Sequence, residues 1–205
     1  MAKKQLARDY YSAPPYDVIL RPQTLAGAWQ RAFGRPAPLH VEIGMGLGHH
    51  LIGFAATHPD WSHVGLELKM HRIYTARHMA LRQGIRNVRF VPGDALKALD
   101  TFADGEVDHL TMLFPDPWPE PLDAHKRLTA PSYIALYRRV LAPGGRMHFR
   151  TDDPDLFRYS METFTQAGFD LTIHVPVARI TTAFERRWLS EGRGIYGLDA
   201  TKRRS

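Results

Sequence analysis

The sequence predicts an α/β fold built on a doubly wound, mostly parallel sheet of seven strands. A chain of 205 residues with 44% hydrophobic and 23% charged side chains is long enough for one domain with a sizeable core. From residue 39 onwards, short apolar runs alternate with helical segments of about ten residues, which is the pattern of βαβ units. The end of the chain instead runs strand, polar loop, strand, so its last strand is predicted to be antiparallel.

Prolines interrupt residues 1–38 at three places, so this segment is predicted to be an N-terminal arm with one short helix near residues 24–33. The arm is basic, because residues 1–35 carry six Lys or Arg against two acids. Residues 39–205 are predicted to form the folded domain. The last part, residues 179–205, is also basic, with seven Lys or Arg against three acids. Basic ends can attract a polyanion or simply keep a chain soluble, and charge alone does not decide between the two.

Within the domain, each strand is predicted from a short apolar run bounded by turn residues. These strands span residues 39–43, 63–68, 88–91, 107–114, 146–151, 169–175 and 194–198, and the fourth is the longest. The helices are predicted from apolar side chains three or four residues apart. They span residues 47–57, 70–83, 96–102, 132–141 and 155–167. In the second helix Ile73, Ala76 and Ala80 share one face, and Gly84 follows as a C-terminal stop.

Composition excludes several classes of protein. The chain has no cysteine, so it forms no disulfide and offers no thiolate to a metal. Its eleven histidines show no metal-ligand spacing, and no metal site is predicted. The N-terminus lacks the apolar core of a signal peptide, and no apolar run approaches the roughly 18 residues of a membrane helix. We therefore expect a soluble, cytoplasmic protein without a membrane partner.

A glycine-rich turn, EIGMGLG, follows the first predicted strand. Gly44 and Gly46 would let a ligand approach the backbone at a helix N-terminus, although such a turn can also serve packing alone. The third glycine is Gly48, whereas the dinucleotide fingerprint G-x-G-x-x-G requires it one residue later. This spacing argues against a nicotinamide-dependent dehydrogenase.

Acidic residues mark the ends of successive predicted strands, and the carboxyl ends of parallel strands lie together at one edge of a sheet. Glu67 is placed to accept hydrogen bonds from both hydroxyls of a ribose. Asp94 and the small Ala95 suit an adenine, although Asp94 can equally cap the following helix. Glu42 would lie near the positive end of a cationic cofactor. Together these residues resemble the S-adenosylmethionine site of Rossmann-like methyltransferases.

The proline-rich loop FPDPWP follows the fourth predicted strand, where such methyltransferases place catalytic or substrate groups. Pro115 and Pro117 fix φ on both sides of Asp116 and would hold its carboxylate rigidly. Trp118 offers a face on which a base can stack, a contact worth about 1–3 kcal/mol. A rigid turn around a structural tryptophan would use the same residues.

These and other segments resemble the bacterial tRNA guanine-N7 methyltransferases over most of residues 40–198. The matching segments are EIGMGLG (42–48), VGLEL (64–68), NVRFVPGDA (87–95), FPDPWP (114–119), KRLTAPSYIALYRRVLAPGG (126–145), FRTDD (149–153) and TAFERRWLSEGRGIYGL (182–198). The pairing of DPWP with a late T-x-F-E is the specific part. The resemblance implies transfer of a methyl group from S-adenosylmethionine to N7 of a guanosine in the variable loop of tRNA. We expect a monomer or a homodimer.

The resemblance, together with the strand-end argument, divides the expected site into three groups. The catalytic residue is Asp116. The cofactor site comprises Glu42, Gly44, Gly46, Glu67, Asp94, Ala95 and Asp116. The substrate site comprises Trp118, Glu120, Asp152, Thr182, Ala183, Phe184 and Glu185. Because guanine N7 carries a free lone pair, the expected reaction is an in-line displacement that needs orientation and electrostatics but neither a base nor a metal.

The match fails directly after DPWP. The family continues with a basic run of the Lys-Lys-Arg-His type, whereas this chain reads EPLD at residues 120–123. A lysine that the family uses on its substrate is thereby replaced by Glu120, and loss of cations weakens phosphate contacts. A paralogous methyltransferase acting on another RNA or on a small molecule is therefore a second hypothesis. A non-catalytic RNA-binding protein is a third, disfavoured by the intact set of cofactor acids.

Overall fold

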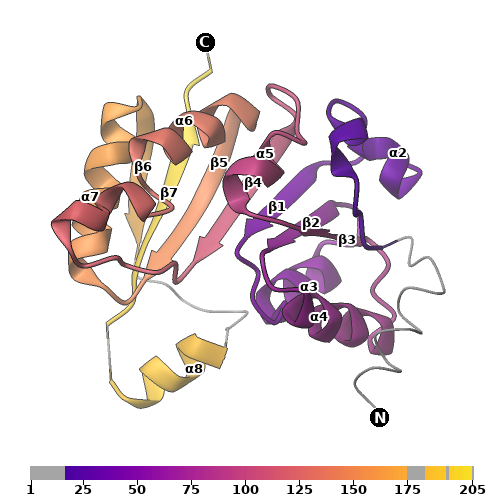
Figure 1. Ribbon diagram of the computed structural model, residues 1–205, viewed down its shortest axis with the longest axis horizontal. Helices are drawn as coiled ribbons and strands as arrows, with labels where there is room; N and C mark the ends of the chain where they lie inside the picture. Colours follow the sequence, from indigo (N-terminus) through magenta and orange to yellow (C-terminus); the bar gives the residue numbers. More distant parts are fainter. Residues whose placement is uncertain (1–16, 175–182, 193, 205) are drawn as a thin grey trace.

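The computed structural model describes residues 17–174, 183–192 and 194–204 (Figure 1). Its centre is one seven-stranded sheet with the strand order β3-β2-β1-β4-β5-β7-β6. Strand β7 is antiparallel to both of its neighbours, β5 and β6, and the remaining neighbouring pairs are parallel. The predicted α/β class and the antiparallel C-terminal strand are thus confirmed.

Each strand occupies a run of largely buried residues. The strands are β1 (Leu39–Ile43), β2 (Ser62–Glu67), β3 (Val88–Pro92), β4 (Val107–Leu113), β5 (Leu141–Thr151), β6 (Phe169–His174) and β7 (Tyr196–Lys202). Every residue of β1 and β2 is buried, because these strands lie inside the sheet and helices cover both faces there. Strand β5, rather than β4, is the longest, since it begins at Leu141 ahead of the proline–glycine turn that was predicted to precede it.

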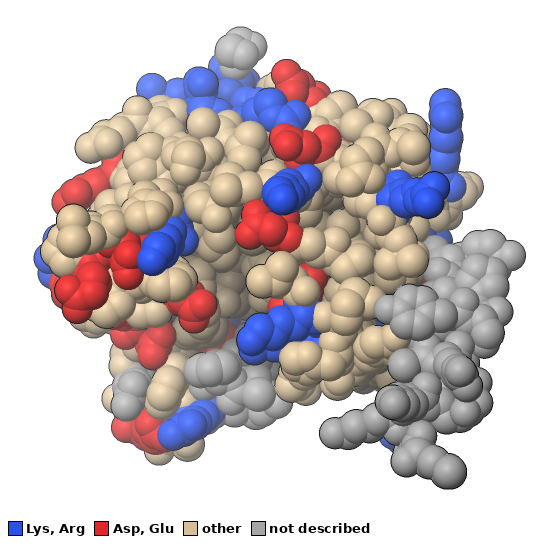
Figure 2. All heavy atoms as spheres, in the orientation of Figure 1, with Lys and Arg blue, Asp and Glu red and all other residues tan. Residues whose placement is uncertain are grey.

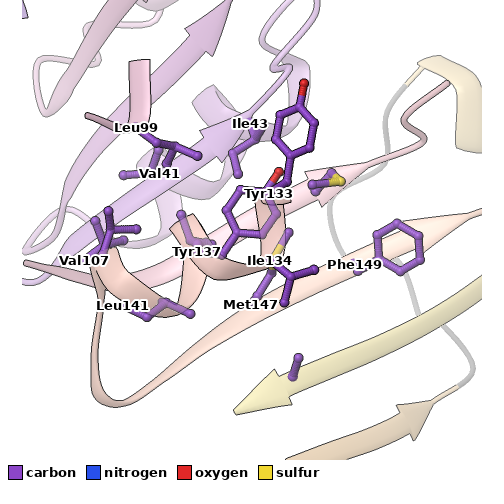
Figure 3. Close-up of a cluster of buried hydrophobic side chains, with 14 of the residues drawn as sticks. Val41, Ile43, Leu99, Val107, Tyr133, Ile134, Tyr137, Leu141, Met147 and Phe149 are labelled. Atoms are coloured by element: carbon purple, nitrogen blue, oxygen red, sulfur yellow. The ribbon is translucent and has the colours of Figure 1, made fainter. Parts of the chain in front are cut away.

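Helices lie on both faces of the sheet (Figure 1). One face carries α2 (Trp29–Phe33), α5 (Ala95–Leu99), α6 (Pro131–Val140) and α7 (Pro154–Gln166), and the other carries α3 (His49–Thr57) and α4 (Met70–Arg82). Figure 3 shows the larger core, in which Ile134 and Tyr137 of α6 pack with Val41 and Met147 of the strands. Burying one such side chain contributes about 1.5–3 kcal/mol. No described helix has both the length and the apolar character to cross a membrane.

The part of the N-terminal segment that the structure describes, residues 17–38, lies against the domain. Trp29 is 1% exposed and stacks on Phe102 at 4.9 Å between ring centroids. The short helix predicted near residues 24–33 forms only in its second half, as α2, and a separate 3-10 helix, η1 (Pro22–Leu25), precedes it. Gly27, with φ of 73°, separates them in a left-handed turn. The domain boundary at residue 38 stays a prediction.

A second correction concerns α8 (Ala183–Ser190), which lies where a polar loop was predicted. Its sequence, AFERRWLS, is rich in charged residues, so it carries little of the apolar signal by which helices are recognised. The helix is fixed by a tertiary contact instead, because Glu185 is fully buried in an ion pair with Arg150 of β5. Local sequence patterns do not reveal such a contact.

A row of imidazoles crosses the sheet on the face covered by α3, with His40 and His63 buried and His109, in β4, half-buried. His40, in β1, lies 3.0 Å from His63 of β2 between their Nδ1 atoms, and its Nε2 lies 2.9 Å from the hydroxyl of Thr111. Burial disfavours the imidazolium cation. It lowers the pKa of His40 well below the ordinary value, the pKa of His63 to about 4 and the pKa of His109 to about 3.

We expect acid to destabilise the protein through these histidines. Their pKa in the folded chain lies below the unfolded value of about 6.5, so the unfolded chain binds more protons in this range. Stability that is fully present above about pH 6.5 is therefore lost as the pH falls toward 4, by about 1.4 kcal/mol per pH unit for each of His63 and His109. Urea denaturation across this range measures the slope. His109→Phe is expected to flatten the slope of the unfolding free energy against pH. His78→Gln, on the exposed side of α4, is expected to leave that slope unchanged. Equal slopes in His109→Phe and the wild type would refute the assignment to His109.

Candidate active site

A cleft of about 730 Å³ lies at the carboxyl ends of β1, β2, β3 and β4. Its volume is in the range of sites that hold a small molecule. The turn after β1, the ends of β2 and β3, the loop after β4 and the start of α6 bound it. The predicted site residues that line the cleft are Gly44, Glu67, Asp94, Ala95, Asp116 and Trp118. Because they come from four separate strand ends, it is the parallel sheet that brings them together.

Glu67, the last residue of β2, is oriented by backbone donors. Its side chain is 5% exposed and accepts hydrogen bonds from the backbone N–H of Gly46 at 3.0 Å and of Lys69 at 2.8 Å. A guanidinium nitrogen of Arg72 lies 3.6 Å from the same carboxylate. The carboxylate therefore joins the glycine turn to β2 and stands in a fixed direction at the wall of the cleft.

The glycines of the turn after β1 serve two different purposes. Gly44, Gly46 and Gly48 all have positive φ, of 68°, 57° and 79°, which side chains other than glycine adopt at a cost. A Cβ on Gly48 would lie 2.5 Å from the Cβ of Ala76, so this glycine lets α3 approach α4. Gly44 lines the cleft and has open space where a Cβ would be. The packing role predicted for this turn is thus confirmed at Gly48, and ligand access at Gly44 stays a prediction.

Glu42 and Gly46 are not among the residues that line the cleft. Glu42 is 3% exposed, and its carboxylate lies 2.8 Å from Nδ1 of His50 in α3. Its position inside β1, rather than after it, sends the side chain toward the helix that covers that face. The roles of Glu42 and Gly46 in a cofactor site stay predictions.

Asp94 caps the following helix, which is one of the two roles predicted for it. Its Oδ1 accepts a hydrogen bond from the backbone N–H of Leu96 at 3.0 Å, at the start of α5. Asp94 and Ala95 both line the cleft, as does Tyr133 of α6. Burial, together with the Asp94 charge, raises the pKa of Tyr133, so its hydroxyl stays protonated and can donate a hydrogen bond. A second carboxylate oxygen of Asp94 remains for a ligand, because each carboxylate has two.

The loop after β4 presents the exposed Asp116 to the cleft between two strained aromatic residues. Phe114 and Trp118 have φ of 51° and 45°, in the left-handed region. This conformation costs a residue other than glycine about 1–3 kcal/mol, persists only where the surroundings enforce it, and clusters at functional sites. The backbone N–H of Phe114 donates to the carbonyl of Arg150 at 2.8 Å. The rigid loop predicted from its prolines is therefore also strained.

The segment after DPWP forms a 3-10 helix, η2 (Pro121–Lys126), beside this loop. Its last residue, Lys126, lies with Nζ 4.9 Å from the ring centroid of Trp118 and 2.7 Å from a carboxylate oxygen of Asp123. Both His125 and Lys126 line the cleft. The helix thus places a cation on the aromatic face, and Asp123 offsets part of its charge.

The residues predicted to hold the substrate are distributed differently. Glu120 is exposed at the start of η2, and Asp152 is half-buried just after β5. Glu185 is buried in α8, beyond the carboxyl end of β5, where it pairs with Arg150 (Figure 1). Thr182 lies outside the described residues, and Ala183 and Phe184 are placed only as the first residues of α8. Their substrate roles stay predictions.

One cluster of possible metal ligands occurs in the described part of the chain, on strands β5, β6 and β7. His148 Nδ1 lies 2.7 Å from Asp199 Oδ1, and His174 Nε2 lies 3.6 Å from the same oxygen. The two imidazole rings stack with an interplanar angle of 8°. Imidazole lone pairs lie in the ring plane, so two parallel rings do not direct them at one ion. The cluster is a hydrogen-bonded His–Asp pair with a stacked histidine.

Comparison with known proteins identifies the family. Residues 36–198 match a family model described as "Putative methyltransferase". The tRNA (guanine-N(7)-)-methyltransferase of Halalkalibacterium halodurans is 37% identical over 98% of this chain and 94% of its own length. The enzyme of the same name from Geobacillus kaustophilus is 35% identical over 98% and 96%. The chain belongs to the tRNA (guanine-N7)-methyltransferase family.

Solved structures agree on the fold of this family member. The 16S rRNA methyltransferase KamB superposes with a TM-score of 0.64 at 16% identity, over 86% of this chain and 93% of its own. A 16S rRNA (adenine(1408)-N(1))-methyltransferase from Catenulisporales acidiphilia, solved with S-adenosylmethionine, gives 0.63 at 18% identity, over 90% and 92%. At such identities the likeness establishes the Rossmann-like methyltransferase fold alone.

The structure adds cleft residues that the sequence argument did not select. They are Lys69 and Arg72 after β2, His125 and Lys126 of η2, and Tyr133 of α6. Lys69 and Arg72 lie two and five residues beyond Glu67, so their closeness to the strand end is a signal that the sequence carries. Lys126 and Tyr133 reach the cleft only because η2 and α6 return to the carboxyl edge of the sheet. No local pattern predicts that return.

Proposed function

We propose that this chain transfers a methyl group from S-adenosylmethionine to N7 of a guanosine in the variable loop of tRNA. The observation that carries the proposal is the similarity to enzymes named for this reaction, at 31–37% identity over nearly the whole chain. The cleft supports it, because it combines acids suited to a nucleoside with Asp116 and Trp118. A cytoplasmic location, where tRNA is found, and a monomer or homodimer belong to the same proposal.

The residues present fit S-adenosylmethionine. A ribose offers two hydroxyl donors and an adenine one exocyclic amine, and the cleft wall supplies carboxylate acceptors at Glu67 and Asp94. Gly44, with open space at its Cβ position, allows close approach to the turn. When bound, the cofactor supplies an electrophilic methyl group. In the proposed arrangement Glu67 binds the ribose, Asp94 and Ala95 bind the adenine, and Asp116 faces the methyl acceptor.

On the acceptor side, the chain supplies orientation and charge. Guanine N7 needs no deprotonation, so the described groups act by holding the base in line and by favouring the positive charge that it gains. Asp116 provides a negative charge on the N7 side, and a different carboxylate would be needed to accept from the N1–H and N2–H edge on the far side of the base. Trp118 provides a stacking surface, with Lys126 on its ring.

Methyl transfer to bulk tRNA tests the proposal. The full chain is incubated with methyl-labelled S-adenosylmethionine and unfractionated tRNA, and the product is digested and the modified base mapped. We expect 7-methylguanosine in the variable loop. Label in another base, in ribosomal RNA or in a small molecule would support the paralogous enzyme instead. Absence of transfer to any of these would reject a catalytic function.

The charge of the segment after DPWP gives a further prediction. Figure 2 shows acidic and basic side chains intermixed on the face that it views, rather than one continuous basic surface. Glu120 is an exposed acid at the start of η2, the helix whose His125 and Lys126 line the cleft. Glu120→Lys is expected to tighten tRNA binding severalfold and to steepen its salt dependence, because each added phosphate contact releases counterions. Filter binding at several salt concentrations measures this slope. An unchanged slope would mean that the start of η2 does not face RNA, and Glu162→Lys on α7 controls for net charge.

A further inference from the structure

Arg127, the residue after η2, binds the backbone of the loop that carries Asp116. Its Nε donates to the carbonyls of Pro117 at 3.0 Å and of Trp118 at 3.3 Å, and its Nη2 donates to Trp118 at 3.1 Å. The flat guanidinium fork suits two neighbouring acceptors, which an ammonium group cannot reproduce. We propose that Arg127 is a positioning residue that fixes the Asp116 loop for methyl transfer, and this rests on the function proposed above.

The side chain and the backbone of Arg127 are themselves held by groups outside the loop. Its Cζ lies 4.5 Å from the ring centroid of Tyr159 in α7, a cation–π contact. The backbone N–H of Arg127 donates to the carbonyl of Ala124 at 3.2 Å, which closes η2. Arg127 therefore connects the loop to α7, an element that lies in the main core.

The loop needs such an external donor. Pro115 and Pro117 have no backbone N–H, so the loop has few donors with which to close its own turn. Phe114 and Trp118 at its two ends hold left-handed φ values that relax unless something enforces them. The Phe114 end is held by the carbonyl of Arg150, and the Trp118 end by Arg127. Release of the second end would displace Asp116 and the Trp118 ring together.

A different role for Arg127 would be a phosphate contact with tRNA. The two roles make separable predictions. Loss of a phosphate contact weakens tRNA binding and reduces its salt slope. Loss of a positioning residue lowers kcat at saturating substrates and leaves the salt slope unchanged. The three donations to loop carbonyls and the half-buried side chain favour the positioning role.

Arg127→Lys tests the proposal, because it keeps the charge and removes the fork. We expect kcat to fall at least about tenfold at saturating tRNA and cofactor, with KM for tRNA and the salt slope unchanged. Arg127→Ala is expected to behave likewise and to recover in part with added methylguanidinium. Tyr159→Leu, which removes the ring under the guanidinium, is expected to give a smaller loss in the same direction. Arg158→Ala, an exposed neighbour on α7, is the matched control and is expected to match the wild type.

A fluorotryptophan NMR spectrum supplies a readout that does not need turnover. The Trp118 resonance is identified with Trp118→Phe, and Arg127→Lys is expected to shift or broaden that resonance alone. An unchanged resonance, a kcat within twofold of the wild type, or a loss confined to tRNA binding would overturn the proposal. Failure of the wild type to methylate tRNA would reject the proposed function, while the spectrum would still decide whether Arg127 holds the loop.

Discussion

Asp116→Ala is expected to lower kcat for methyl transfer on the order of 10²-fold, the usual effect of removing one preorganised electrostatic group from an active site. During the reaction, positive charge moves from the sulfonium to the guanine, and a carboxylate at the acceptor favours that movement. Asp116 is suited to this role because it lines the cleft and two prolines and two left-handed aromatic residues define the backbone around it. The affinity of this variant for the cofactor is expected to stay within a few-fold of the wild type, since Glu67 and Asp94 are the residues proposed to accept from the nucleoside.

Asp116→Asn separates charge from shape. The amide keeps the volume and one acceptor oxygen but removes the negative charge, so an electrostatic role predicts a loss close to that of the alanine variant. Initial rates with labelled S-adenosylmethionine give kcat, calorimetry gives cofactor affinity, and thermal unfolding checks the fold. Asp155→Asn, an exposed acid on α7, is the matched control. Turnover near the wild-type value in Asp116→Ala would remove this carboxylate from the mechanism.

The sequence predicts those parts of the site that depend on topology. Glu67 is the last residue of β2, Asp94 and Asp116 follow β3 and β4, and the parallel order of these strands brings their carboxyl ends to one edge. Glu42 differs because it lies within its strand. There the alternation of side chains, rather than the end of the strand, decides its direction, and the structure turns it toward His50.

What the sequence leaves undetermined depends on tertiary contacts. Two hydrogen bonds hold Phe114 and Trp118 in left-handed conformations. The N–H of Phe114 donates to the carbonyl of Arg150, and the guanidinium of Arg127 donates to the carbonyl of Trp118. The two arginines are distant from one another along the chain. Helix α8 is anchored by the buried Glu185 rather than by its own apolar pattern. Both features arise from arginines whose partners no local pattern reveals.

The same limit applies to charge. The EPLD segment holds two acids and no cation, so its composition predicts weak phosphate contacts. In the folded chain it forms η2, which places Lys126 on the ring of Trp118 and Asp123 beside Lys126. A cation is therefore present at the cleft, but an adjacent acid weakens its field. The number of charges predicts the direction of the change in phosphate affinity. The fold determines which group at the cleft carries that change.

Glu67→Ala is expected to weaken S-adenosylmethionine binding by about 3 kcal/mol, roughly a hundredfold, if its carboxylate accepts from two ribose hydroxyls. The structure assigns this residue a second task, since it already accepts from the backbone of Gly46 and Lys69. The substitution is therefore also expected to lower the melting temperature of the cofactor-free protein, because two partly buried N–H groups lose their acceptor.

Glu67→Gln distinguishes the two tasks. The amide retains one oxygen, so it is expected to preserve more of the turn than alanine does while lacking the charge that strengthens bonds to the ribose. Calorimetric titration with S-adenosylmethionine measures the affinity, and thermal unfolding without it measures the turn; Glu162→Ala, exposed on α7, controls for loss of an acid. A lower melting temperature with unchanged cofactor affinity would mean that Glu67 serves the glycine turn only. The ribose would then lie elsewhere in the cleft, with Asp94 as the remaining predicted carboxylate on that wall.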